Sequence, residues 1–241
     1  MPYSDILVTL LDILELATCP TFSESDIVCL GVIVKHFLPG DEDFLNSNTK
    51  CLFKPISKEN LKPWKISASE AAEIQSKLNI PDLHCTPKPR SNWDISVAHS
   101  NISVATGRVF DFIMAQFRFR RQGETPLKGT FGWNEIDYED FYGGNGGFLF
   151  STSGRYKGVD TPAWRTCLLE EWWNGEVLAG PSLRLVLCTD EFGKKGCLLL
   201  SELGAIAQLI TFRRTQSEFQ TFQLFPVLLI SLFGPRHGRI I

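Results

Sequence analysis

An apolar run near the end of the sequence places the strongest constraint on how this chain can fold. Residues 224–233 read Leu-Phe-Pro-Val-Leu-Leu-Ile-Ser-Leu-Phe, and only Pro226 and Ser231 interrupt the apolar side chains. A membrane-spanning helix needs about 20 apolar residues, so the run is too short to cross a bilayer. We therefore expect a buried strand, with Gly234-Pro235 as a turn and 236–241 as the start of a partner strand.

The partner strand expected after this turn is short. A strand that stops early leaves backbone groups and apolar side chains at the edge of a sheet. The pattern therefore predicts a protein partner, or self-association, through the C-terminal edge strand.

Helical periodicity dominates the first half of the sequence. Ser23-x-x-Asp26 resembles a capping signal, and Ser67-x-x-Glu70 is a capping box. The turn-rich segment 40–66 is expected to be a long surface loop or linker. Helices are expected in four segments, 4–17, 26–37, 67–78 and 100–121.

Strand and helix signals alternate in the second half. Thr161-Pro162 is typical of a helix start and Asn174-Gly175 of a helix end, which predicts a helix between them. Strands over 183–188 and 197–200 are expected to form a hairpin, and a helix over 203–214 to lead into the terminal strand. The expected fold class is α+β, with mixed α/β as the alternative. It combines a helical N-terminal half with a strand-hairpin-helix-strand C-terminal half.

Three regions follow from this reading. The first, 1–122, is mostly helical and contains the loop 40–66. The second, 123–147, is a loop rich in acidic, aromatic and glycine residues, where a functional surface would most easily lie. The third, 148–241, combines strands and helices. One single domain over the whole chain is the alternative.

Composition favours a folded, cytoplasmic protein. Hydrophobic residues make up 44% of the 241 residues, which is enough for a core. The formal net charge of −3 provides no overall field for nucleic acid, so nucleic-acid binding is not favoured. The N-terminus lacks the basic segment of a signal peptide, and Asp5, Asp12 and Glu15 interrupt the apolar residues there. We expect no secretion and no membrane span.

The cysteines indicate a reducing compartment. They are odd in number, scattered, and form no Cys-x-x-Cys pair, which is typical of reduced cysteines in an intracellular protein. The alternative is a bridge between Cys188 and Cys197 across the expected hairpin. The cysteines stand at positions 19, 29, 51, 85, 167, 188 and 197.

No motif predicts a cofactor or a metal. The glycine run 143–147 lacks the Gly-Lys-Ser/Thr of a phosphate loop and follows several carboxylates that would repel phosphate. Asp137, Glu139 and Asp140 are near enough in sequence to be candidate ligands for a hard cation. Their spacing matches no calcium loop, and a solvated acidic face that meets a basic partner is the favoured interpretation.

Aromatic, basic and histidine residues supply the remaining candidates. Trp133, Trp164, Trp172 and Trp173 could line a pocket for a small apolar metabolite, with His99 or His237 as acid or base. Arg118, Arg120 and Arg121 lie among phenylalanines and could bind a partner's carboxylates.

The sequence at 225–240, Phe225-Pro-Val-Leu-Leu-Ile-Ser-Leu-Phe-Gly-Pro-Arg-His-Gly-Arg-Ile240, resembles a tail pattern of filamentous-fungal proteins that have no assigned activity. The resemblance covers about the last 40 residues, from Glu202 onward. In those proteins the strand at His-Gly-Arg continues further, which implies that this chain is a shortened member. Many of their genes lie beside secondary-metabolite genes, so the resemblance implies an accessory role in a biosynthetic pathway.

The leading functional hypothesis from the sequence is a soluble intracellular binding or accessory protein, since no catalytic motif occurs. The alternative is an enzyme that acts on a small apolar metabolite in a pocket lined by the tryptophans.

Overall fold

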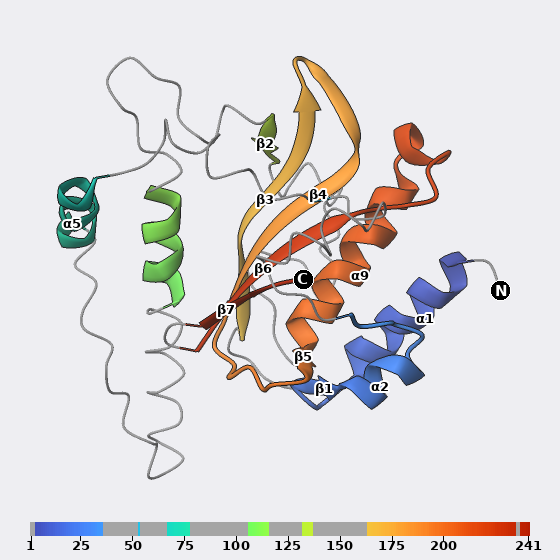
Figure 1. Cartoon of the computed structure of the whole chain (residues 1–241). Coiled ribbons are helices and arrows are strands. Elements are labelled where there is room, and N and C mark those ends of the chain that lie inside the picture. The colour runs from blue at the N-terminus through green and yellow to red at the C-terminus, as the bar shows by residue number, and fades with distance from the viewer. Residues whose placement is uncertain are drawn as a thin grey trace, which may run out of the picture.

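A computed structural model describes residues 3–35, 53, 67–77, 106–115, 132–136, 163–234 and 237–241. Within these residues, a five-stranded sheet has the order β2-β3-β4-β6-β7, and a second sheet pairs β1 with β5 (Figure 1). In chain order the elements are α1 (Tyr3–Leu16), β1 (Thr21–Ser23), α2 (Glu24–Cys29), α5 (Ala68–Lys77), a helix over 106–115, β2 (Trp133–Glu135), β3 (Trp164–Asn174), β4 (Val177–Thr189), β5 (Cys197–Leu199), α9 (Leu200–Thr215), the 3-10 helix η2 (Ser217–Phe219), β6 (Val227–Phe233) and β7 (His237–Ile240).

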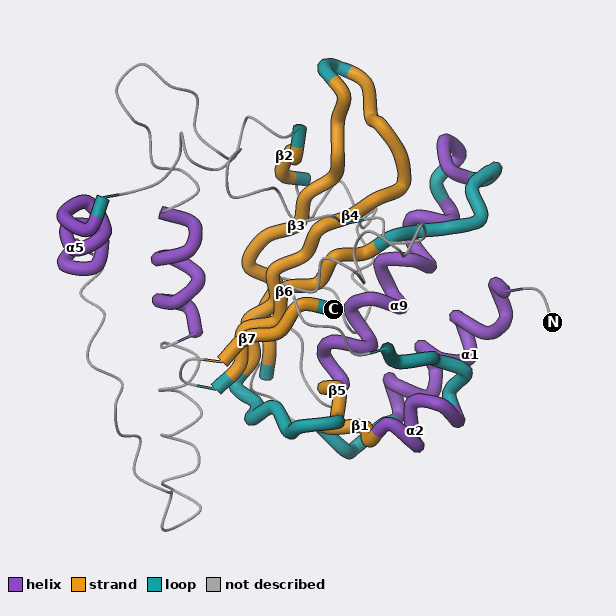
Figure 2. The backbone as a smooth tube through the Cα atoms, viewed as in Figure 1, coloured by secondary structure: helices purple, strands orange, loops and turns teal. Residues whose placement is uncertain are grey.

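The expected fold class is wrong, because sheets rather than a helical half organise the described residues (Figure 2). The N-terminal segment contributes strand β1, which pairs antiparallel with β5. The expected hairpin between 183–188 and 197–200 is therefore wrong in its pairing, although both strands exist. Segment 190–196 carries the chain away from β4, and β5 completes the small sheet with β1 instead.

The helix expected between Pro162 and Asn174 is also wrong, because 164–174 forms strand β3. β3 pairs antiparallel with β4 from Trp164 to Asn174. Asn174-Gly175 ends no helix: Asn174 is the last residue of β3 and pairs with Val177, and Gly175, with φ +67, begins the two-residue turn of this hairpin. A two-residue turn with glycine at its first central position is a common hairpin connection. Here it outweighs the helix-start signal of Thr161 and Pro162, which lie outside the described residues.

Both capping signals in the N-terminal half are confirmed. The Ser23 N–H donates to Asp26 Oδ2 at 2.8 Å, and the Ser67 N–H donates to Glu70 Oε2 at 2.7 Å. The second helix nevertheless ends at Cys29, well before the expected position 37. Gly31, with φ +77, follows its C-cap, and this left-handed geometry is a common helix terminator.

Most of the terminal apolar run forms a strand as expected, but β6 begins at Val227, and Leu224 at the start of the run is 67% exposed. β6 pairs in parallel with β4, and the segment between them supplies α9, which covers one face of the sheet. β7 then returns antiparallel to β6, as the sequence predicts. β4 lies between β3 and β6, and its residues Leu183, Leu185 and Leu187 are buried on the face toward α9. A near-continuous apolar run is typical of such a central strand.

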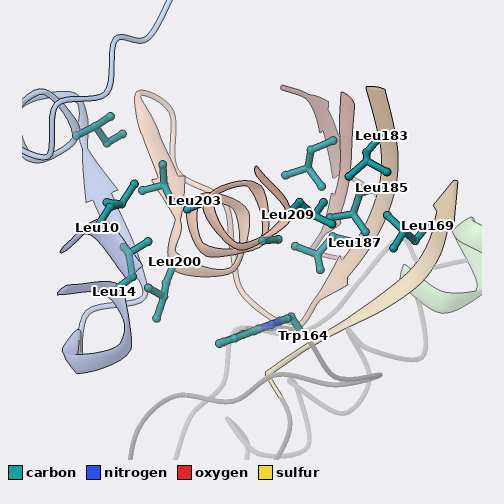
Figure 3. Packing of buried hydrophobic residues seen from close by; sticks show 14 residues of the cluster. Leu10, Leu14, Trp164, Leu169, Leu183, Leu185, Leu187, Leu200, Leu203 and Leu209 are labelled. Atoms are coloured by element: carbon teal, nitrogen blue, oxygen red, sulfur yellow. The ribbon is translucent and has the colours of Figure 1, made fainter. Parts of the chain in front are cut away.

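Two groups of buried side chains lie on opposite faces of the five-stranded sheet. On one face, α9 packs between the sheet and α1 (Figure 3). The other face packs against the helix over 106–115. The second group contains Met114, Leu168, Val186, Cys188 and Leu232.

Candidate functional site

The face of the sheet that packs against the helix over 106–115 brings two cysteine sulfurs together. The register between β3 and β4 shifts between Thr166 and Leu168, which leaves Cys167 in a bulge. Cys188 lies on the neighbouring strand, opposite Arg165. The two sulfur atoms are 3.0 Å apart, and both cysteines are free. Cys167, Cys188 and Arg165 are called the dithiol site below.

Charge and burial make the two thiols of the dithiol site different. The hydrogen bond with Cys188 lowers the pKa of Cys167, and the charge of Arg165 lowers it further, while burial and Asp111 oppose both. The hydrogen bond with Cys167 raises the pKa of Cys188, and burial raises it further. Cys167 is therefore the more nucleophilic sulfur.

The helix over 106–115 closes one side of the dithiol site. A side chain at Gly107 would collide with the Arg165 guanidinium, so the helix backbone lies directly against that group. The Cys188 thiol donates to the Thr106 carbonyl oxygen at 3.8 Å, at the first described residue of this helix. The chain therefore holds Arg165 and both sulfurs between two strands and a helix.

A second cluster on the same face contains a buried carboxylate. The Arg184 guanidinium donates to Glu170 Oε2, and it also lies 4.9 Å from the centroid of the Trp133 ring. Glu170 is fully buried, and its Oε1 atom has no hydrogen-bond partner. Phe53 stacks on Trp133 at 6.2 Å. The cluster ties β2 to β3 and β4 and leaves one strong acceptor unused.

The C-terminal strand presents a regular backbone edge. Leu229 and Ile241 exchange both backbone hydrogen bonds at 2.9 Å. Because bonded and non-bonded pairs alternate in an antiparallel ladder, Gly238 and Ile240 turn their N–H and C=O groups away from β6. β7 is the last strand of the described sheet on this side. Ile240 is 49% exposed.

The catalytic candidate His237 lies on this strand, beside an ion pair. Its ring stacks on Phe233 at 6.1 Å, and the Arg239 guanidinium lies 4.6 Å from the centroid of the same phenyl ring. Arg239 Nε is 3.0 Å from Glu202 Oε1, an ion pair without hydrogen-bond geometry. The other Glu202 oxygen accepts from the Leu199 N–H at 2.7 Å. Glu202 therefore anchors the start of α9 to β7.

Glu202 is expected to give the protein a measurable pH dependence. Burial raises the pKa of this carboxyl above 4.5, although Arg239 opposes the shift. Below pH 4.5 the Glu202 carboxyl is protonated in both the folded and the unfolded protein. As the pH rises, the unfolded protein loses this proton first, so the contribution of Glu202 to the free energy of unfolding falls until the pH has passed the pKa of the folded protein. Urea unfolding of wild type and Glu202→Gln over a pH series should show a difference, wild type minus variant, that falls as the pH rises. A rising or constant difference would contradict this prediction.

The structure does not gather the four candidate tryptophans. Trp164 is buried in the core near α9, at one end of β3. Trp133 and Trp172 face each other across β2 and β3 at the other end. Trp173 donates from its indole to Glu171 at 2.9 Å. Trp172 lies eight positions after Trp164 along β3, about 26 Å at the usual rise per residue.

Several candidates lie outside the described residues, namely Arg118, Arg120, Arg121, His99, Asp137, Glu139 and Asp140, together with the loop 143–147. Among the described residues, no three His, Cys, Asp or Glu side chains lie together as metal ligands. None of the described helices is long and apolar enough to cross a membrane.

The alternative bridge between Cys188 and Cys197 does not fit the structure. Cys197 lies in β5, opposite Ser23, whereas Cys188 meets Cys167. The signal that could have found the dithiol site is the Asn174-Gly175 turn, because a hairpin at that turn makes the strands before and after it neighbours. The bulge that brings Cys167 toward Cys188 has no sequence signal.

Comparisons with protein families, curated proteins and solved structures found no match for this chain.

Proposed function

We propose that the chain is a binding protein and that its partner adds a strand to the outer edge of β7. The observation that carries this proposal is the outward direction of the Gly238 and Ile240 backbone groups. In the described part of the chain, no strand pairs with that side of β7. Unpaired edges of this kind bind extended segments through main-chain hydrogen bonds.

A second copy of the chain is the partner that fits this edge. Two β7 strands that pair antiparallel around a twofold axis at Arg239 place Ile240 of each copy opposite Gly238 of the other. The half-exposed isoleucine then covers a residue that has no side chain. The two Arg239 side chains would face each other, but each already forms an ion pair with Glu202.

Two further observations support an intracellular accessory role as part of the same proposal. Free cysteines favour a reducing compartment such as the cytoplasm; those described are Cys19, Cys29, Cys167, Cys188 and Cys197. The tail resemblance supports an accessory role in a fungal biosynthetic pathway. An enzyme with a tryptophan-lined pocket is the alternative, and the division of the tryptophans between two ends of β3 favours the binding role.

Light scattering during size-exclusion chromatography over a concentration series tests the self-association. Wild type should shift from monomer to dimer with rising concentration, since the pairing strand is short and its hydrogen bonds contribute little individually. Ile240→Lys should remain monomeric, because a charged residue at this edge opposes pairing. Leu224→Lys, at an apolar residue that is 67% exposed elsewhere, should dimerise like wild type.

Amide hydrogen exchange provides a readout that is specific to the edge. On association, the amides of Gly238 and Ile240 should become protected, whereas the Arg239 amide, which faces β6, should change little. A monomer at every concentration would refute the proposal. A dimer that persists in Ile240→Lys and leaves both outward amides unprotected would refute it as well.

A further inference from the structure

We propose that Cys167 and Cys188 form a reversible thiol–disulfide pair that a hydroperoxide oxidises, with Cys167 as the attacking thiol and Cys188 as the resolving thiol. The inference is independent of the strand pairing at β7, which lies at the edge of the sheet. It concerns the dithiol site between β3, β4 and the helix over 106–115.

The distance between the two sulfurs is the first argument. A disulfide bond is about 2.04 Å long, and the two free sulfurs are 3.0 Å apart. Bond formation therefore requires about 1 Å of approach. The β3 bulge places Cys167 out of regular register, where the strand can accommodate this movement more easily than a paired residue can.

The surroundings of the two sulfurs give each a different role. Cys167 is only partly buried and is bordered by Arg165, so a small oxidant can reach a sulfur next to a positive charge. Cys188 is buried beneath the helix over 106–115 and is held against Cys167. Asp111, on that helix, carries the negative charge that opposes ionisation of the Cys167 thiol.

The reaction needs no group other than the hydroperoxide. The Cys167 thiolate attacks the peroxide, the O–O bond breaks, and Cys167 becomes a sulfenic acid while the other oxygen leaves as water or an alcohol. The Cys188 sulfur then attacks the Cys167 sulfur, the S–S bond forms, and the sulfenic oxygen leaves as water. Two electrons pass from the thiols to the peroxide. A dithiol reductant reverses the change by thiol–disulfide exchange.

Peptide mapping of the full chain after treatment with hydrogen peroxide tests the pairing. Trypsin places Cys167 on peptide 166–184 and Cys188 on peptide 185–194, each with one cysteine. We expect these two peptides to become linked, with the loss of two hydrogen atoms, and to separate again after dithiothreitol. Cys197→Ser is the matched control, since Cys197 is also partly buried, and it should give the same link.

Single variants separate the two roles. Cys188→Ser should accumulate a sulfenic acid at Cys167 that dimedone traps, because no resolving thiol remains. Cys167→Ser should leave Cys188 as a thiol. Links that mainly involve other cysteines, or oxidation of Cys167 no faster than that of Cys197, would overturn the proposal.

Charge variants provide a readout that a structural role of Arg165 would not change. The pH at which iodoacetamide reacts with Cys167 at half its maximal rate should rise in Arg165→Gln and return toward the wild-type value in Arg165→Lys. The same pH should fall in Asp111→Asn, because a negative charge is removed. If both Arg165→Gln and Asp111→Asn leave this pH unchanged, Arg165 does not activate Cys167 and the assignment of the attacking thiol is wrong.

Discussion

Replacing Leu185 with alanine is expected to lower the free energy of unfolding by about 3 kcal/mol. Leu185 is fully buried at the centre of β4, opposite Leu169 on β3 and Leu229 on β6, both also fully buried. Its side chain faces α9 (Figure 3), so truncation removes apolar contacts and leaves a cavity that the rigid sheet cannot fill.

Urea unfolding followed by circular dichroism measures this loss. The control is Val177→Ala on the same strand, where the side chain is 69% exposed and the change should stay within about 0.5 kcal/mol. If Leu185→Ala cost no more than Val177→Ala, the layer between α9 and the sheet would not be the core of the protein.

Replacing Arg213 with alanine is expected to cost a similar amount, about 3 kcal/mol, for an electrostatic reason. The buried guanidinium donates to Glu171 at 2.8 Å and to Gln216 at 2.9 Å, and it stacks 4.4 Å from the centroid of the Phe219 ring. Its removal leaves the Glu171 carboxylate largely buried, and among the described residues the Trp173 indole is then its one remaining side-chain donor. The Glu171 side chain is still 15% exposed. We therefore expect a cost at the lower end of the range for a buried ion pair that loses one partner.

The matched control is Arg214→Ala, at the next residue of α9, which is half-buried. Both variants lose one positive charge and have the same helix propensity change. The difference between their free energies of unfolding therefore reports the buried contacts of Arg213. Equal losses in the two variants would show that these contacts contribute nothing beyond charge and propensity.

Parts of the fold that depend on near neighbours in sequence could be predicted. α1 follows from helical periodicity, and the caps at Ser23 and Ser67 depend on residues three positions away. The apolar run predicts β6 because burial of its side chains is its only stable outcome. The Gly234-Pro235 turn predicts β7, because an antiparallel partner strand needs only a few residues to reverse the direction of the chain.

Predictions that depended on which strands pair failed. β3 carries signals that suit either a helix or a hairpin, and pairing with β4 decides between them. β5 has a turn that points back to β4, but it pairs with β1, more than 170 residues earlier in the chain. Residue type alone suggested the tryptophans and histidines as site residues, whereas the proposed thiol chemistry depends on a register shift of one residue.

The sequence by itself determined which segments must be buried and how several helices begin, since apolar surface and capping hydrogen bonds are properties of the local chain. The tertiary structure alone decided how strands far apart in the sequence pair, and it placed the β3 bulge that brings Cys167 to Cys188. The physical reason is that strand pairing satisfies backbone groups on segments far apart in sequence. Many alternative pairings satisfy them equally well locally, and only the packing of α9, α1 and the helix over 106–115 on the two faces of the sheet selects one.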